Sequence, residues 1–317
     1  MKLQTQIPIQ KADNPIDYES NVVLFGSCFA ENISEKFSYF KFQNTSNPFG
    51  ILFHPKAIEN LIVNALQQKV YTKDDVFYYN ERWQCYDAHS KLSCTSEEGV
   101  LATLNAKLEL TNYQLKKASH IIITLGTAWV YALKESSVIV ANCHKVPQKE
   151  FEKCLLTIAE ITKSLETIIS KVKAINPKVQ FVFTVSPVRH IKDGFIENTL
   201  SKSHLIAAIH HLLKTESNSD KRVSYFPSFE IMIDELRDYR FYNEDLLHPN
   251  MMAVHYIWEQ FQSAWIVPKA TPIMKEIDAV QKGLIHKPFN PSSQAHLKFL
   301  EDLQRKIAHL QSLNINF

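Results

Sequence analysis

The sequence predicts an α/β protein with a doubly wound, flavodoxin-like parallel sheet. Short apolar runs of strand length alternate with longer segments of helical periodicity, an order typical of strands joined by helical crossovers. Glycine is rare, with 6 in 317 residues, and Gly26, Gly50 and Gly126 each follow a predicted strand or strand exit. In open parallel sheets the functional crevice lies outside the carboxyl ends of the strands. We therefore expect the functional residues near these three glycines.

The first predicted strand covers residues 22–25, an uninterrupted apolar run that suits burial on both faces. After Gly26 the pattern changes, and apolar residues recur at helical spacing over residues 29–40. A buried strand that turns at Gly26–Ser27 into a helix is the layout of a serine nucleophile. The alternative is that Ser27 only caps the helix. Ala30 occupies the position where a capping box has Glu or Gln, which favours the nucleophile.

The remaining elements follow in order along the chain. Strands are predicted at 41–45, 120–125, 179–185 and 223–226, and helices at 57–67, 101–117, 148–173, 197–213 and 251–265. Small hairpin insertions are predicted at about 70–95 and 129–145, bordering the carboxyl edge of the sheet. The α/β domain is expected to span residues 1–267.

A C-terminal helical extension is predicted over residues 268–317, with helices near 273–285 and 293–313. Its last helix has a short coiled-coil-like seam, formed by Leu300, Leu303, Ile307 and Leu310. The seam covers only about two heptads, so we expect it to pack against the main domain. A homodimer contact through these helices is the alternative.

Composition excludes several classes of function. The formal net charge of +2 gives no field that would attract nucleic acid, and no run of about 18 apolar residues predicts a membrane span. The N-terminus lacks the apolar region of a signal peptide. The cysteines are odd in number and form no CxxC pair: Cys28, Cys85, Cys94, Cys143 and Cys154. Reduced thiols in the cytoplasm are therefore expected.

A second candidate functional position is His248, which lies three residues after Asp245 and just before a predicted helix. A serine hydroxyl is a poor nucleophile until a base removes its proton. A neutral imidazole does this near pH 7, and a carboxylate holds the imidazole in the required tautomer. Ser27, His248 and Asp245 are therefore predicted to be nucleophile, base and orienting acid. The alternative is that His248, one of 13 histidines, is structural.

The stretch Phe-Gly26-Ser27-Cys28-Phe-Ala30 resembles the namesake motif of the GSCFA domain family. That family is similar to the SGNH (GDSL-like) hydrolases, which pair a serine in a first block with a histidine in a late Asp-x-x-His block. Further similar stretches are Asn-Pro-Phe-Gly50, Asp-Ala-His89-Ser90, Gly126-Thr-Ala-Trp-Val-Tyr, Ala-Asn142-Cys-His144-Lys, Thr-Val-Ser186-Pro and Tyr225-Phe-Pro-Ser-Phe-Glu230. The resemblance covers about residues 20–265 and leaves the tail outside.

The resemblance implies the same three catalytic residues, and an oxyanion hole formed by the serine N–H, a glycine N–H and an asparagine side chain. Ser27 and Gly50 fit the first two. The asparagine is missing, because Gly126-Thr127-Ala128 replaces the expected Gly-x-Asn. The Thr127 hydroxyl or the Asn142 side chain is the expected substitute. Loss of one donor costs about 100- to 1000-fold in rate, so weak activity on simple esters is expected. Gly26 also replaces the aspartate that many GDSL relatives have before the serine.

The expected function is therefore a serine esterase that cleaves an acyl ester, with O-acetyl on a carbohydrate suggested by fold-level analogy. No metal or cofactor is expected. The residues expected to contact substrate are His89, Trp129, Tyr131 and His144, although the two aromatic residues could equally pack the insertion. Four hypotheses compete with this function: an acyltransferase with the same residues, a non-catalytic binding module, a Cys28 nucleophile, and a metal site formed by His54, His89 and His144.

Overall fold

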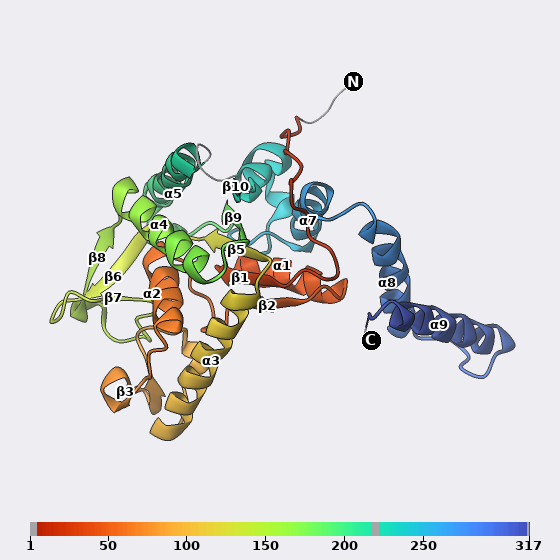
Figure 1. Cartoon of the computed structure of the whole chain (residues 1–317), viewed down its shortest axis with the longest axis horizontal. Helices are drawn as coiled ribbons and strands as arrows, with labels where there is room; N and C mark the ends of the chain where they lie inside the picture. The colour runs from red at the N-terminus through yellow and green to blue at the C-terminus, as the bar shows by residue number, and fades with distance from the viewer. Residues whose placement is uncertain (1–4, 217–221, 316) are drawn as a thin grey trace.

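The structure, a computed structural model, describes residues 5–216, 222–315 and 317 (Figure 1). A five-stranded parallel sheet forms its centre, with the spatial order β2–β1–β5–β9–β10. The strands are β1 (Val22–Gly26), β2 (Asn44–Ser46), β5 (His120–Leu125), β9 (Gln180–Val185) and β10 (Val223–Tyr225). This order confirms the predicted doubly wound α/β fold.

The three central strands form because their sequences bury apolar side chains on both faces. Every residue of β1, β5 and β9 is buried. In β1, Val23 and Phe25 pack into one apolar cluster, whereas Val22 and Leu24 pack into a second cluster on the opposite face. This alternation follows from the two-residue period of a strand. The sheet therefore requires a helical layer on each side.

Those two helical layers come from different parts of the chain. One face is covered by α2 (Pro55–Leu66), α3 (Glu97–Lys117), α4 (Ile158–Ile175) and α5 (Phe195–Glu216). The other face is covered by α1 (Cys28–Tyr39), α7 (Met251–Trp265) and α8 (Ala270–Leu284). A short helix, α6 (Ser228–Glu230), continues into a π-helical turn, Ile231–Leu236. Helices therefore flank the sheet on both faces, as in other doubly wound folds.

Two antiparallel insertions interrupt the α/β order. The first is the hairpin of β3 (Phe77–Tyr79) and β4 (Arg82–Gln84). The second is a three-stranded sheet in the order β7–β6–β8, formed by β6 (Trp129–Leu133), β7 (Ile139–Val140) and β8 (Phe151–Leu155). Figure 1 shows this second sheet at the side of the molecule remote from α9 (Gln294–Ser312).

The predicted helix over residues 148–173 is wrong at its start. Residues 151–155 form β8, which pairs along its whole length with β6, so cross-strand pairing overrides the local helical pattern. The helix α4 begins only at Ile158, where Thr157 and Glu160 form a capping box. That capping signal is present in the sequence and marks the true start of the helix.

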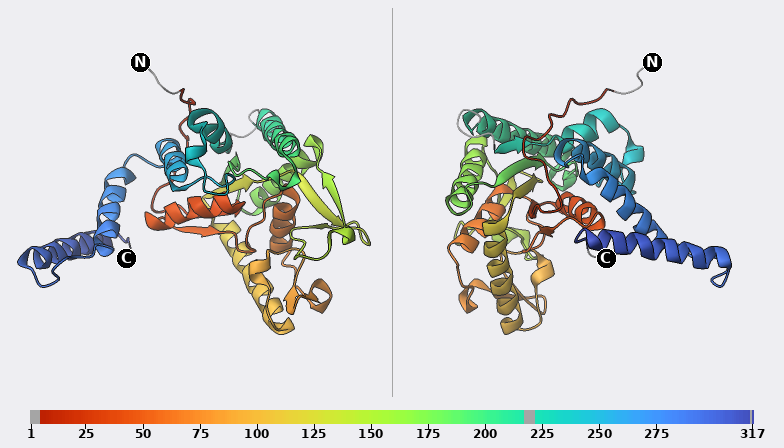
Figure 2. Two further views of the ribbon diagram at one scale, coloured as in Figure 1. Left: turned by 180° about the vertical axis from the view of Figure 1, so that it is seen from behind. Right: turned by 45° about the vertical axis from the view of Figure 1, so that its right-hand side comes forward.

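The C-terminal helices are present as predicted, and they pack against the rest of the chain. The hydroxyl of Tyr39 donates to Asp278 Oδ1 at 2.9 Å, which joins α1 to α8. The helix α9 folds back on α8, where Leu303 lies against Gly283, yet much of it projects from the body (Figure 2). Within the described ranges, no helix has both the length and the apolar character needed to cross a bilayer.

Candidate active site

Ser27 lies at the turn from β1 into α1, as the sequence predicts. Gly26 has φ +135°, and a Cβ at this position would lie 2.1 Å from the carbonyl oxygen of Thr124 on β5. Only glycine therefore permits this turn. Ser27 Oγ accepts a hydrogen bond from Phe29 N at 3.3 Å, so it caps α1. Its side chain is also at the carboxyl edge of the sheet, and only 1% of the residue is exposed.

Asp245 and His248 lie together at the tip of a small hairpin, residues 241–250, which we call the His248 hairpin. The main chain of Tyr242 pairs with that of Pro249, and Asn243 N donates to His248 O at 2.8 Å. At the tip, Asp245 Oδ2 lies 2.6 Å from His248 Nδ1. The predicted Asp–His pair is therefore present in the structure, and both side chains are partly open to solvent.

Three hydrogen bonds stabilise the ionised form of Asp245. Its Oδ1 accepts from the main-chain N–H groups of His248 and Leu247 at 3.0 and 2.9 Å, and Oδ2 pairs with the His248 ring. Donation to a carboxylate favours its charged form. These bonds, those from the His248 and Leu247 main chain first, lower the pKa of Asp245 to about 2. The carboxylate therefore stays charged and holds Nδ1–H of His248.

Arg189 joins the His248 hairpin to the carboxyl edge of the sheet. It follows β9, and its N–H donates to Leu247 O at 3.1 Å. Its Nη1 donates to Leu246 O at 3.0 Å, at a residue held with φ +58°. The guanidinium also lies 5.5–5.9 Å from the ring centroids of Phe195, Tyr239 and Tyr242. The Asp–His pair is therefore fixed to the same sheet edge as Ser27, although no hydrogen bond joins Ser27 Oγ to His248 in the described chain.

The two predicted main-chain donors of the oxyanion hole already have partners. Ser27 N donates to Thr124 O at 3.1 Å, and Gly50 N donates to Asn47 O at 2.7 Å. Gly50 has φ +75°, and a Cβ there would lie 2.5 Å from His89 Cβ, so this turn also requires glycine. A substrate oxygen would have to compete with the existing acceptors for these two N–H groups. Their role in oxyanion binding stays a prediction.

The two predicted side-chain substitutes also make contacts inside the protein, Thr127 through its hydroxyl and Asn142 through its oxygen. Thr127 Oγ1 lies 2.9 Å from Ser201 Oγ on α5 and accepts from Trp129 N at 3.1 Å. Asn142 Oδ1 accepts from His144 N at 2.8 Å. These contacts fasten the loop after β5 to α5 and shape the turn after β7. The structure thus gives both residues a local structural function, and a catalytic one stays a prediction.

The four predicted substrate-contact residues belong to the two insertions. His144 donates through Nε2 to Cys85 O at 2.7 Å, which leaves Nδ1 to accept from Ser90 beside His89. Trp129 Nε1 donates to Glu197 O at 3.1 Å, and the Tyr131 ring lies edge-on to that of Phe151. His89 and His144 come together, whereas the two aromatic residues brace the second insertion. Substrate contact by any of the four stays a prediction.

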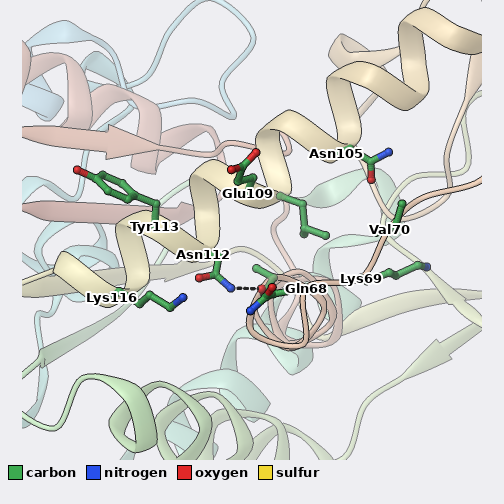
Figure 3. Close-up of a pocket in the computed structure, with 10 residues that line it drawn as sticks. Gln68, Lys69, Val70, Asn105, Glu109, Asn112, Tyr113 and Lys116 are labelled. Carbon is green, nitrogen blue, oxygen red and sulfur yellow. Dashed lines mark hydrogen bonds between the residues drawn. The ribbon is translucent and has the colours of Figure 1, made fainter.

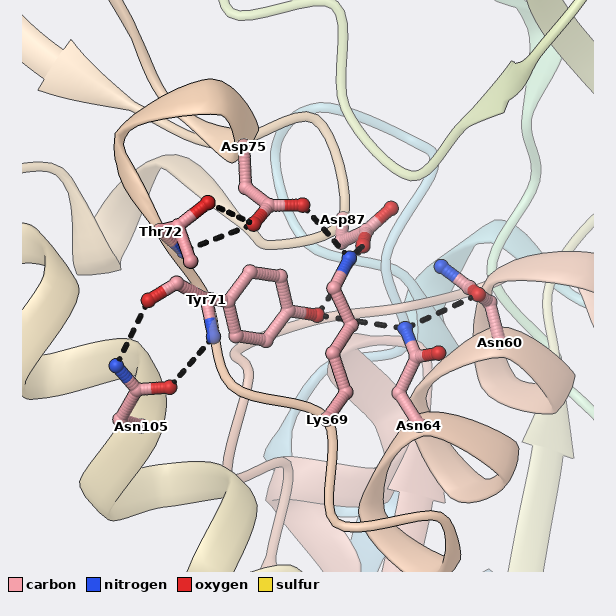
Figure 4. Close-up of polar contacts among 8 residues, drawn as sticks. All are labelled: Asn60, Asn64, Lys69, Tyr71, Thr72, Asp75, Asp87 and Asn105. Carbon is pink, nitrogen blue, oxygen red and sulfur yellow. Dashed lines mark hydrogen bonds and ion pairs between the residues drawn. The ribbon is translucent and has the colours of Figure 1, made fainter.

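The first insertion is held in place by a polar network around Tyr71 (Figure 4). The Tyr71 hydroxyl donates to Asp87 Oδ2 at 3.1 Å, two residues before His89. Asn105 on α3 bonds both the N–H and the carbonyl of Tyr71, and Lys69 bridges to Asp75 at 2.8 Å. This network fixes the segment that carries His89 to α2 and α3.

A cavity of about 570 Å³ lies between α2 and α3, away from the candidate site (Figure 3). Its lining includes Gln68, just beyond the end of α2, and Lys116 near the end of α3. Because α2 starts at the carboxyl edge of the sheet and α3 ends where β5 begins, this cavity lies toward the amino edge. Asn112 spans its floor by donating to Ala65 O.

Two buried groups near the site carry no sequence motif that would reveal them. Lys202 on α5 donates to the carbonyls of Gly126 and Ser186, both at 2.7 Å, and thus ties the ends of β5 and β9. Burial lowers the pKa of Lys202 to about 7. His190 Nε2 is buried without a partner and lies 3.0 Å from where a Gly126 Cβ would be. Burial, followed by the charge of Lys202, lowers the pKa of His190 to about 3.

The structure disfavours Cys28 as the nucleophile. A helix N-terminus lowers the pKa of a thiol when solvent and donors reach it. Here burial dominates and raises the pKa of Cys28, so little thiolate forms near neutral pH.

The three histidines considered for a metal site do not form one. Both ring nitrogens of His54 are bonded to main chain: Nδ1 accepts from Ala57 N at 3.1 Å, and Nε2 lies 3.0 Å from Val140 O. Burial lowers the pKa of His54 to about 4. No cluster of three or more His, Cys, Asp or Glu side chains suited to a metal ion occurs in residues 5–216, 222–315 and 317.

The fold and the site together define a doubly wound α/β protein with a serine at its first strand–helix turn and an Asp–His pair at the same edge. The chain belongs to the GSCFA family, whose model matches residues 21–261. A second model, that of the GSCFA domain protein, C-terminal domain, matches residues 277–317. The tail, which the sequence resemblance left outside, is therefore part of the family's own pattern.

Two solved structures similar to this chain are distant from it in sequence. One is a protein provisionally described as a platelet activating factor from Streptococcus pneumonia, at 11% identity and TM-score 0.42, covering 77% of this chain and 83% of that chain. Another is an acetyl xylan esterase (Est2A) from the rumen bacterium Butyrivibrio proteoclasticus, at 10% identity and TM-score 0.36, covering 86% of this chain and 66% of that chain. No curated protein matches the chain.

Proposed function

We propose that this protein is a serine hydrolase of the SGNH type that cleaves an acyl ester, with an O-acetylated carbohydrate as the substrate class. The observation that carries the proposal is the 2.6 Å contact between Asp245 and His248, at the sheet edge where β1 delivers Ser27. A base oriented by a carboxylate is what a serine requires to become a nucleophile. Membership of the GSCFA family supports the same assignment, and the sugar rests on fold-level analogy.

The contacts of His248 define its role in the proposed reaction. Because Asp245 accepts Nδ1–H, the lone pair of Nε2 is left to take the Ser27 proton. The serine oxygen then bonds to the ester carbonyl carbon, and the carbonyl oxygen becomes an oxyanion. When that intermediate collapses, the alcohol leaves with the proton from Nε2. Water repeats the sequence on the acyl-serine and regenerates the enzyme.

Ser27 is shielded from water, so its hydroxyl meets substrate only when the loops over the sheet edge move. A small fluorophosphonate probe tests this directly, because the serine oxygen displaces fluoride and retains the phosphonyl group. The wild-type protein should be labelled slowly but completely, and Ser27→Ala should not be labelled. The same two proteins should differ by at least about 100-fold on a panel of simple esters and O-acetylated sugars.

Ser186→Ala is the matched control, since Ser186 also follows a central strand, is buried, and accepts a hydrogen bond from a main-chain N–H two residues on. It should be labelled as the wild type is. Equal labelling of the Ser27→Ala protein would remove Ser27 from the mechanism. Acyl transfer to an acceptor alcohol in place of water would identify an acyltransferase.

A further inference from the structure

The residue that completes the oxyanion hole is absent from the position where the resemblance places it. Ala128 stands at the asparagine position, its side chain is fully buried, and its N–H donates to Ser201 Oγ at 2.7 Å. The N–H groups of Ser27 and Gly50 and the hydroxyl of Thr127 have partners inside the protein, and Asn142 is bonded through its side-chain oxygen. An asparagine elsewhere at the sheet edge would restore the missing amide.

Asn47 is such a residue, and it adjoins the nucleophile turn. It follows β2, the strand next to β1, and Asn47 N donates to Leu24 O at 2.9 Å. Its carbonyl accepts from Gly50 N at 2.7 Å. Its Oδ1 accepts from Gly26 N at 2.9 Å, one residue before Ser27. Both main-chain groups and the side-chain oxygen are therefore fixed.

The remaining group of Asn47, the Nδ2 amide, has no hydrogen-bond partner although it is buried. The residue is only 8% exposed. The hydrogen bond from Gly26 N fixes which end of the Asn47 side-chain amide is the oxygen. If the amide were flipped, its NH₂ group would face the N–H of Gly26, and two donors cannot form a hydrogen bond. The two ends of one side-chain amide lie roughly 2.3 Å apart, so Nδ2 is held close to the Gly26–Ser27 turn.

The backbone of Asn47 shows that this placement is not a relaxed one. Its φ is +41°, which asparagine tolerates better than most residues but which remains uncommon. Pro48 follows it and restricts it further. A buried donor without a partner, on a backbone held in an unfavoured region, is an arrangement typical of functional sites.

We propose that Asn47 is a catalytic residue, whose Nδ2 amide donates to the oxyanion formed when Ser27 attacks the ester. The proposal rests on the proposed hydrolase function. Strands β2 and β5 lie on opposite sides of β1. In this proposal the loop after β2 supplies the asparagine that is missing from the loop after β5. Ser27 and Asn47 Nδ2 are both shielded from water here, so the same loop movement exposes nucleophile and donor together.

The test compares the rates of fluorophosphonate labelling in the wild type and in Asn47→Asp. Aspartate keeps the oxygen that accepts from Gly26 N and nearly the same volume, but it removes the donor. Labelling and ester turnover should slow by about 100- to 1000-fold, with KM changed little, because the lost bond forms only with the oxyanion. Asn60→Asp makes the same chemical change on α2, where Oδ1 accepts from Asn64, and should behave as the wild type does.

A second measurement does not depend on the variant folding. In ¹⁵N spectra of the wild-type protein, the two Asn47 side-chain amide protons should move downfield when Ser27 is phosphonylated. Unmoved signals, or equal labelling rates for wild type and Asn47→Asp, would overturn the assignment of Asn47 alone. A wild-type protein that takes up no probe would overturn the hydrolase function and this inference with it.

Discussion

Lys202 is the most unusual charged residue at the candidate site. A lysine is almost never fully buried unless it is paired, yet Lys202 is 1% exposed and its two protein partners are main-chain carbonyls. Desolvation disfavours the ammonium form, which is why its pKa falls to about 7. The residue fastens the ends of β5 and β9, and these ends carry the loops that lead to Thr127 and Arg189.

The depressed pKa makes stability depend on pH with a definite sign. Between about pH 7 and 10 the unfolded chain keeps the Lys202 proton while the folded chain releases it, so stability should rise with pH across this window. The free energy of unfolding can rise by at most roughly 1.4 kcal/mol per pH unit from this one proton. Urea unfolding at pH 7 and pH 9 should show this rise in the wild type and a smaller one in Lys202→Met.

Lys202→Met should also be less stable at both pH values, because two buried carbonyls lose their donor at about 1–3 kcal/mol each. Replacement of the exposed Lys163 on α4 by Met provides the comparison and should leave the slope unchanged. A slope in Lys202→Met equal to that of the wild type would show that the Lys202 proton is not linked to folding.

At this scale the sequence reveals the groups that lie in motifs and hides those that do not. Ser27 and the Asp245–His248 pair follow from a strand–glycine–serine turn and a three-residue spacing. Lys202 sits inside an ordinary helical pattern, so no local signal marks it. Asn47 lies in the Asn-Pro-Phe-Gly50 stretch, which attracts attention in the sequence because of its glycine. That the Nδ2 group of Asn47 has no hydrogen-bond partner becomes apparent only in the structure.

Among the elements, the His248 hairpin depends on its attachment to the loop after β9. Arg189 supplies two hydrogen bonds to Leu246 and Leu247, and aromatic rings surround its guanidinium. A lysine lacks the planar fork that allows such bonding and stacking together. The arginine therefore positions the Asp–His pair through the main chain of its hairpin.

Arg189→Met should keep contact with the rings but lose the bond to Leu246 O. A displacement of the base by about 1 Å costs up to about 100-fold, so kcat/KM should fall by about 10- to 100-fold with little change in melting temperature. Arg240→Met is the control, since Arg240 immediately precedes the same hairpin and pairs with the exposed Asp238. Steady-state kinetics on the best ester of the panel would measure both. Equal losses in the two variants would argue against a specific role for Arg189.

Whether a segment forms a helix or a strand was predictable wherever the spacing of its apolar residues and its length indicated the same element. The buried strands at 120–125 and 180–185 match the prediction closely, because a continuous apolar run between breaks has few other uses in an α/β protein. The strand β8 was not predictable in the same way. Its five residues have no strong pattern of their own, and their conformation is decided by β6, whose paired residues lie 18 to 26 positions earlier in the sequence.

For the whole molecule, the position of α9 decides whether the C-terminal extension is part of the core. Leu310 is fully buried and belongs to the cluster beneath α1 and α7, whereas Leu300 is 40% exposed near the projecting end of the same helix. Leu310→Ala should therefore destabilise the protein by about 2–4 kcal/mol, and Leu300→Ala by less than about 1 kcal/mol. Denaturant unfolding measures both.

The alternative for this helix, a homodimer contact, predicts a different result for the same two variants. If the seam joins two copies, Leu300→Ala should lower the sedimentation coefficient at micromolar concentration while Leu310→Ala unfolds the tail. Similar unfolding costs for the two variants would show that α9 is not seated as the structure has it.

The close approach of the Gly26 backbone to β5 limits which residues can be introduced at this turn. Many GDSL-like hydrolases, which the GSCFA motif resembles, have an aspartate at this point, and grafting that residue here is an obvious design step. The first carbon of any side chain would begin 2.1 Å from the Thr124 oxygen, on a backbone with φ +135°. The graft therefore requires β1 and β5 to move apart. This would break the parallel pairing that holds Gly26 opposite Thr124. A designer would have to transplant the pair of strands together with the turn.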